Sequence, residues 1–65
     1  MEKKYFDIHV DVEGVGYSVF VEGDFTKKTA VEYAILENMF TEKGDEEYIN
    51  NVTEITKEEY ERATA

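Results

Sequence analysis

The fold of this chain is decided by residues 5–22, which read YFDIHVDVEGVGYSVFVE. Apolar and polar side chains alternate on either side of residues 13–16, with the period of two that is typical of a half-buried β-strand. The two glycines between these runs favour a turn, because glycine adopts positive φ without strain. The stretch therefore predicts a β-hairpin with strands at residues 5–13 and 17–22.

The apolar residues of the hairpin also predict its register. We expect Val12 to lie opposite Tyr17, because this pairing gathers the apolar residues of both strands on one face of the sheet. That face carries Phe6, Ile8, Val10, Val12, Tyr17, Val19 and Val21. The other face carries Asp7, His9, Asp11, Ser18, Phe20 and Glu22, with Asp7 opposite Glu22.

A helix is expected after the hairpin, from an N-cap at Thr26 to about Phe40. The segment is rich in alanine, glutamate, leucine and methionine and lacks proline. Gly44 is expected to close it in a left-handed conformation. At about 100° per residue its apolar side chains form two arcs, although a helix lying on a sheet needs only one. The arcs are Ala30, Val31, Ala34 and Ile35, and Tyr33, Leu36 and Phe40.

The remainder of the chain predicts a third strand and a short helix. The strand lies within residues 46–55, where an irregular alternation indicates a bulge near Asn50 and Asn51. Thr56 and Glu59 match a capping box, which predicts a helix over residues 57–63.

The element order is then ββαβ with a C-terminal helix, in a single small acidic domain over residues 1–65. Because the helix after the hairpin can cross the sheet, we expect the third strand beside the first and antiparallel to it. The fold class is therefore α+β, with a three-stranded sheet of order 2-1-3 that one helix covers on its apolar face. The other face is expected to be open to solvent or to a partner.

The composition excludes several classes of function. The chain has 65 residues, with 16 acidic side chains against 7 basic ones and a net charge of -9, so it should repel phosphates and not bind nucleic acid directly. It has no cysteine, which excludes disulfides and thiolate sites and favours the cytoplasm. No apolar run approaches the roughly 20 residues of a membrane span, and no signal peptide is recognisable. A domain this small has little core for a cleft, so we expect neither an enzyme nor a cofactor.

One candidate for chemistry is the single histidine, His9, which shares its strand face with Asp7, Asp11 and Glu22. Alternate residues of a strand project from one face at steps of about 6.6–7 Å, and histidine with carboxylates could hold a divalent metal or act as a base. The alternative is a solvated face on which the histidine eases repulsion between carboxylates. We favour this alternative and predict no metal site, because a flat face does not supply convergent ligands.

The second candidate is the acidic surface as a whole. Carboxylates at regular spacings could imitate a phosphate backbone and dock on the basic groove of a nucleic-acid-binding protein. The alternative is that the acids only keep a small domain soluble. We expect a non-enzymatic binding or inhibitor protein of the acidic kind found in phages and mobile elements. The predicted partner-binding residues are Asp7, Asp11, Glu13, Glu22, Glu46, Glu47, Glu58 and Glu59.

The third candidate is the second arc of the helix, formed by Tyr33, Leu36 and Phe40. Exposed aromatic residues in one patch are typical of an interface, which favours a small structural or accessory protein that forms a homodimer. The alternative is that the C-terminal tail folds back over these residues and makes them part of the core.

Overall fold

The sheet is built around β1 (Lys4–Val12), which pairs antiparallel with β2 (Val15–Gly23) on one side and β3 (Ile49–Ile55) on the other. The strand order β2-β1-β3 and the α+β class confirm the prediction. The computed structural model describes residues 2–65. Its remaining elements are α1 (Lys27–Leu36), the 3-10 helix η1 (Asp45–Tyr48) and α2 (Lys57–Thr64).

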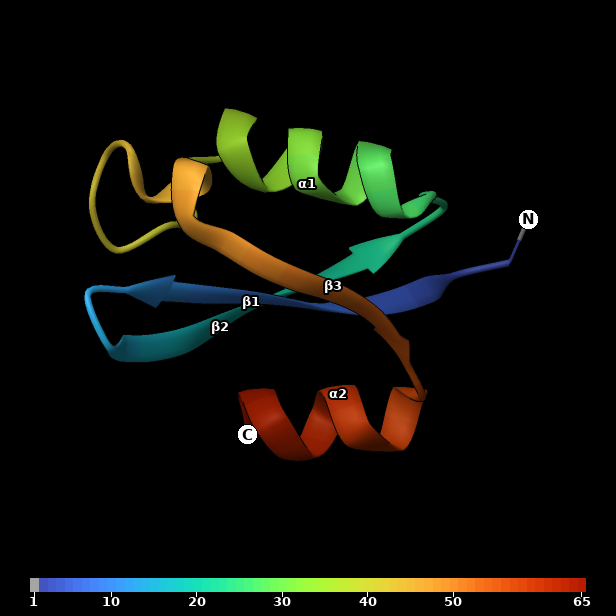
Figure 1. Ribbon diagram of the computed structural model, residues 1–65. Helices are drawn as coiled ribbons and strands as arrows, with labels where there is room; N and C mark the ends of the chain where they lie inside the picture. The colour runs from blue at the N-terminus through green and yellow to red at the C-terminus, as the bar shows by residue number, and fades with distance from the viewer. Residues whose placement is uncertain (1) are drawn as a thin grey trace.

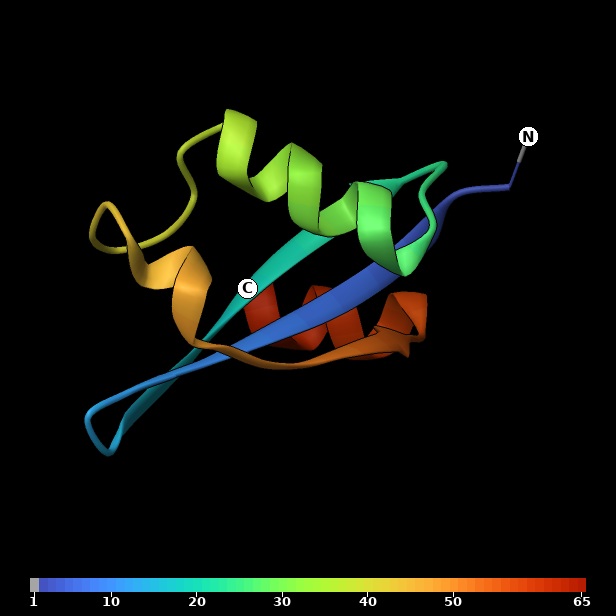
Figure 2. The ribbon, with the colours of Figure 1, turned by 45° about the horizontal axis from the view of Figure 1, so that its top comes forward.

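A helix lies on each face of this sheet. Helix α1 covers the apolar face, as predicted, whereas α2 lies across the opposite face, which we expected to be open (Figures 1 and 2). The capping box at Thr56 starts α2 directly after β3, so the chain turns beneath the sheet, and the Tyr60 ring packs against that of Tyr5 at 5.1 Å between centroids. The second face is therefore partly covered.

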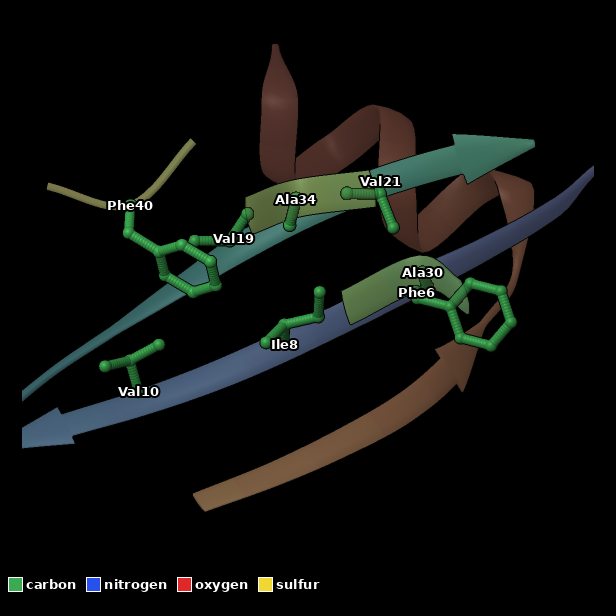
Figure 3. Close-up of a cluster of buried hydrophobic side chains, with 8 residues drawn as sticks. All are labelled: Phe6, Ile8, Val10, Val19, Val21, Ala30, Ala34 and Phe40. Carbon is green, nitrogen blue, oxygen red and sulfur yellow. The ribbon is translucent and has the colours of Figure 1, made fainter. Parts of the chain in front are cut away.

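The core lies between α1 and the upper face of the sheet (Figure 3). Alternate residues of β1 and β2 point into it, as the period of two predicted, and α1 contributes small side chains. Its buried members are Phe6, Ile8, Val10, Val19, Val21, Ala30, Ala34 and Phe40.

The hairpin register differs from the predicted one by two residues. Val12 pairs with Val15 and not with Tyr17, because the turn consists only of Glu13 and Gly14. Both have positive φ, 51° and 85°, as a type I′ turn requires, and this turn matches the twist of the strands. A shift of two residues leaves every side chain on its predicted face, so the core residues were predicted correctly although their partners were not.

Helix α1 begins at the predicted N-cap, Thr26, but ends at Leu36, before the predicted Phe40. Asn38 takes a left-handed conformation with φ of 55° and stops the helix. The Met39 N–H donates to the Ala34 carbonyl at 3.0 Å, and the Asn38 N–H donates to that of Ile35. These bonds form a Schellman motif, which satisfies carbonyls at the end of the helix.

This early end changes the roles of two residues downstream. Phe40 leaves the helix and turns into the core beside Val19, where it is 8% exposed, so its predicted place in an exposed helical arc is wrong (Figure 3). Gly44 does have positive φ, but it precedes η1 instead of capping α1.

The predicted bulge in β3 is confirmed at Asn50. His9 pairs with Asn51, and the next residue of β1, Val10, pairs with Ile49, so Asn50 has no partner in β1. The predicted helix at the C-terminus is also confirmed, with a capping box between Thr56 and Glu59.

A buried polar contact holds the segment between α1 and β3 against the hairpin. The Tyr17 hydroxyl donates to Asp45 Oδ2 at 2.6 Å, and the Glu42 N–H donates to the same oxygen at 3.3 Å. The Thr41 N–H in turn donates to the Tyr17 hydroxyl. Asp45 is only 8% exposed, and burial of Tyr17 together with its bond to Asp45 raises the pKa of the phenol.

The substitution Tyr17→Phe should lower the melting temperature by several degrees, because Asp45 would lose its shortest hydrogen bond while remaining buried. A raised pKa in the folded state also means that Tyr17 stabilises the fold below its ordinary pKa of 10.0, and that this contribution disappears as the pH rises further. Thermal unfolding between neutral and alkaline pH measures both effects. Tyr48→Phe, at an exposed tyrosine, is the matched control, and equal melting temperatures for the two variants would contradict the assignment.

Candidate functional site

The eight predicted partner-binding acids do not form one surface. Five face the α2 side of the sheet or lie in α2 itself, Glu13 occupies the hairpin turn, and two lie in η1 on the α1 side (Figure 1). The five are Asp7, Asp11, Glu22, Glu58 and Glu59, and the two are Glu46 and Glu47. The structure therefore separates them into two groups on opposite faces.

Three of these acids make a hydrogen bond or an ion pair within the fold, and a fourth is half-buried. Glu59 accepts hydrogen bonds from the backbone and hydroxyl of Thr56, which lower the pKa of its carboxyl group. Glu46 accepts the Gly44 N–H at 3.1 Å. The other two are Asp7, half-buried with Oδ1 inaccessible and without a hydrogen bond, and Glu22, whose carboxylate lies 3.7 Å from Lys3 Nζ.

The four remaining acids are exposed: Asp11, Glu13, Glu47 and Glu58. Within residues 2–65, the Lys3–Glu22 contact is the one ion pair. Most surface carboxylates therefore have no basic side chain near enough to neutralise them.

His9 lies in the middle of the α2 face, but its neighbours across the sheet are polar and uncharged. It pairs with Ser18 in β2 and Asn51 in β3, not with Phe20 as the predicted register required. Its ring lies against the backbone at Gly16, where an added Cβ would be 3.2 Å from Cε1 and Nε2. Across residues 2–65, no three histidine or acidic side chains are grouped to hold a metal ion.

The end of α1 presents a patch of exposed apolar side chains. Leu36 is 82% exposed, and Tyr33 is also exposed, with its ring held against that of Phe25 at 5.0 Å between centroids. We name the group Tyr33, Ile35, Leu36 and Met39 the α1 patch. The C-terminal helix does not cover it, because α2 lies on the other face of the sheet (Figure 2).

Two members of the α1 patch were not predicted. The sequence places Ile35 in the same apolar arc as Ala30 and Ala34, and Met39 within the predicted helix but in neither arc. Both are exposed because the contact of α1 with the core is made by Ala30 and Ala34, with Val31 partly buried beside them. The signal in the sequence was the excess of apolar side chains over what one stripe can bury.

The surface has a hollow on each side of the sheet. The one beside the α1 patch has a volume of about 310 Å³ and is lined by Ile35, Asn38, Phe40, Glu42, Lys43 and Glu46. The one beneath the sheet has about 270 Å³ and is lined by Asp7, Phe20, Ile55, Glu59, Arg62 and Ala63. Each therefore combines apolar walls with charged side chains.

Comparisons of the chain with protein-family models, with curated proteins and with solved structures give no match. None of the helices within residues 2–65 has the length and apolar character needed to cross a membrane. The chemistry of the surface is therefore the basis for a functional assignment.

The excess of unpaired carboxylates predicts that salt stabilises this domain. Raising NaCl from about 20 mM to about 500 mM shortens the range of their mutual repulsion, so the melting temperature should rise. Differential scanning calorimetry measures the change. The variant Glu47→Gln/Glu58→Gln, which has two charges fewer, should show a smaller rise. A melting temperature that falls with salt would mean that attractive pairs dominate.

The cap of α2 gives a second prediction. Thr56→Ala removes the hydroxyl that bonds the Glu59 N–H at 3.1 Å and should destabilise the helix by about 1 kcal/mol. Hydrogen bonding from Thr56 lowers the pKa of Glu59. The stabilisation that ionised Glu59 gives the folded state is therefore present above the ordinary pKa of 4.5 and disappears as the pH falls below it. Amide hydrogen exchange in α2 at neutral and acidic pH measures this effect. Thr64→Ala, which removes a bond at the other end of the helix, is the control, and equal exchange in both variants would contradict the prediction.

Proposed function

We propose that this chain is a non-enzymatic acidic protein that binds a basic, nucleic-acid-handling surface of a protein partner in the cytoplasm and blocks it. The observation that supports this proposal is the uncompensated surface charge. The chain carries 16 acidic side chains against 7 basic ones, and one ion pair is found among residues 2–65. A field of this sign attracts a basic surface and speeds its association.

The positions of the exposed acids in ordered elements also support the proposed binding function. Asp11 lies near the end of β1, Glu13 in the tight hairpin turn, and Glu58 in the first turn of a capped helix. These elements are held by hydrogen bonds, so the backbone that carries the carboxylates is ordered before binding. Binding of a partner therefore costs little backbone conformational entropy in this protein.

The surroundings of His9 favour binding over catalysis. A general base needs a substrate within reach and a group that orients it. The cross-strand neighbours of His9 are Ser18 and Asn51, and the Cε1 and Nε2 atoms of its ring lie close to Gly16.

A second candidate function is self-association through the α1 patch, as a small structural or accessory protein. The exposure of Leu36 supports it, because exposed apolar clusters commonly mark interfaces. Sedimentation of the protein across a range of salt concentrations tests this candidate. An apolar dimer would persist or strengthen as salt rises, whereas a monomer throughout would exclude it.

The test of the principal proposal is competition with nucleic acid. Partners captured from a lysate by the tagged protein at low salt are purified, and their binding to labelled DNA or RNA is followed by fluorescence anisotropy. This protein should displace the nucleic acid, and displacement should weaken as salt rises. A complex that holds the partner, the nucleic acid and this protein together would overturn the proposal.

A charge-reversed variant identifies the residues responsible. It changes only exposed acids that make no hydrogen bond within the fold, so that the caps at Glu46 and Glu59 remain. We expect it to lose at least about tenfold in affinity for the partner, with an unchanged circular dichroism spectrum. Equal affinity would contradict the choice of residues. The substitutions are Asp11→Lys, Glu13→Lys, Glu47→Lys and Glu58→Lys.

A further inference from the structure

The α1 patch is surrounded by carboxylates. At about 100° per residue, Glu32 lies roughly 40° from Leu36 around the helix and one turn earlier, and Glu37 lies about 100° to the other side. Glu42 and Glu46 line the adjoining hollow, with Lys43 between them in the sequence. Glu46 accepts the Gly44 N–H, so we name the other three, Glu32, Glu37 and Glu42, the acidic rim.

The hollow continues the apolar surface inward. Ile35 and Phe40 contribute its apolar wall, and Phe40 belongs to the core, so this wall is fixed by the fold. A volume of about 310 Å³ lies at the small end of the range for ligand pockets and is large enough to receive a side chain of a partner. The patch therefore offers an exposed apolar residue, Leu36, near a recess that has one apolar wall and charged side chains around it.

The segment that carries this surface is held in place. Tyr33 stacks on Phe25, the Schellman motif at Asn38 fixes the end of the helix, and the bond between Tyr17 and Asp45 holds the following loop. An interface that is ordered before binding costs less conformational entropy. Met39, with its flexible thioether, can still adapt to the shape of a partner.

A second copy of this chain would fit the surface poorly. Two copies that met here would bring two acidic rims together, each on a chain of net charge -9. Like charges that face one another across an interface repel, and this repulsion opposes a small apolar contact. A segment with apolar residues on one side and lysine or arginine on the other satisfies both parts of the surface.

We propose that the α1 patch and its acidic rim bind a basic amphipathic helix of a protein partner, with the apolar side of that helix on Leu36 and its cations on the rim. This inference rests on the proposed function, because it adds a contact at the end of α1 with the same basic partner, separate from the contact that the exposed acids Asp11, Glu13, Glu47 and Glu58 make. Apolar anchors at helical spacing laid into a groove are a recurring mode of peptide recognition.

The probe is a synthetic peptide of about 18 residues with leucine at i, i+3, i+4 and i+7 and lysine elsewhere. Fluorescence anisotropy should show binding that weakens with salt, and amide shifts in a two-dimensional NMR spectrum should centre on Leu36 and Met39. A scrambled peptide of the same composition has the same charge but no apolar side. Equal affinity for the two peptides would overturn the inference.

Matched variants locate the apolar contact. Leu36→Ser should weaken binding of the probe by about tenfold, because the anchoring side chain is lost while the core is untouched. Val15→Ser is the control, since Val15 is also exposed, at 69%, but lies at the start of β2 and outside the patch. Equal weakening by both substitutions would contradict the proposed position.

Matched charge variants locate the ionic contact and separate this inference from the proposed function. Glu37→Gln/Glu42→Gln should weaken binding of the probe, whereas Glu58→Gln/Glu61→Gln, with the same net charge but on α2, should not. The reverse result would place the basic ligand on the α2 face, which overturns this inference and leaves the proposed function standing. If the probe binds at Leu36 but this protein displaces nucleic acid from none of the captured partners, the proposed function alone is overturned.

Discussion

The contact of Ala30 and Ala34 with β1 and β2 is the constraint on which the arrangement of this small domain depends. Both methyl groups are fully buried, so the axis of α1 comes close to the sheet and the side chains of β1 fill the space between them (Figure 3). A helix whose fully buried residues are two alanines, with Val31 partly buried beside them, leaves Tyr33, Ile35 and Leu36 exposed. The large side chain of Phe40 then fills part of the core, which it reaches only because the helix stops at Leu36. The buried core and the exposed α1 patch therefore have the same cause.

Local signals in the sequence predicted most of the elements but not their exact ends. The alternation of residues 5–12, the caps at Thr26 and Thr56 and the irregular pattern at Asn50 each depend on neighbours within a few positions, and each was confirmed. The register was missed because it depends on Glu13 taking positive φ, which glutamate rarely does. The end of α1 was missed because the composition remains helical beyond the residue that stops it. The place of α2 depends on contacts far apart along the chain, and alternation cannot reveal those.

The structure sorts carboxylates that the composition leaves equivalent. Asp45 is buried and bonded to Tyr17, Glu59 closes the start of α2, and Glu46 bonds the backbone at Gly44. These acids make contacts within the fold. Fewer carboxylates are therefore available to a partner than the number of acidic residues suggests, and they lie at other positions. The sequence predicted an acidic surface and, separately, an exposed apolar surface on the helix. The meeting of both kinds of surface at the end of α1 follows only from the early stop of that helix and the loop that returns beside it.

The unpaired residue at Asn50 has a consequence for how this chain behaves at high concentration. Strand β3 is an outer strand, and a regular outer strand offers a row of free N–H and C=O groups on which another chain can add and start aggregation. A bulge increases the local twist and interrupts that row near the start of the strand. The irregularity that made the alternation of β3 poor in the sequence thus makes its outer edge less able to pair with strands from other molecules.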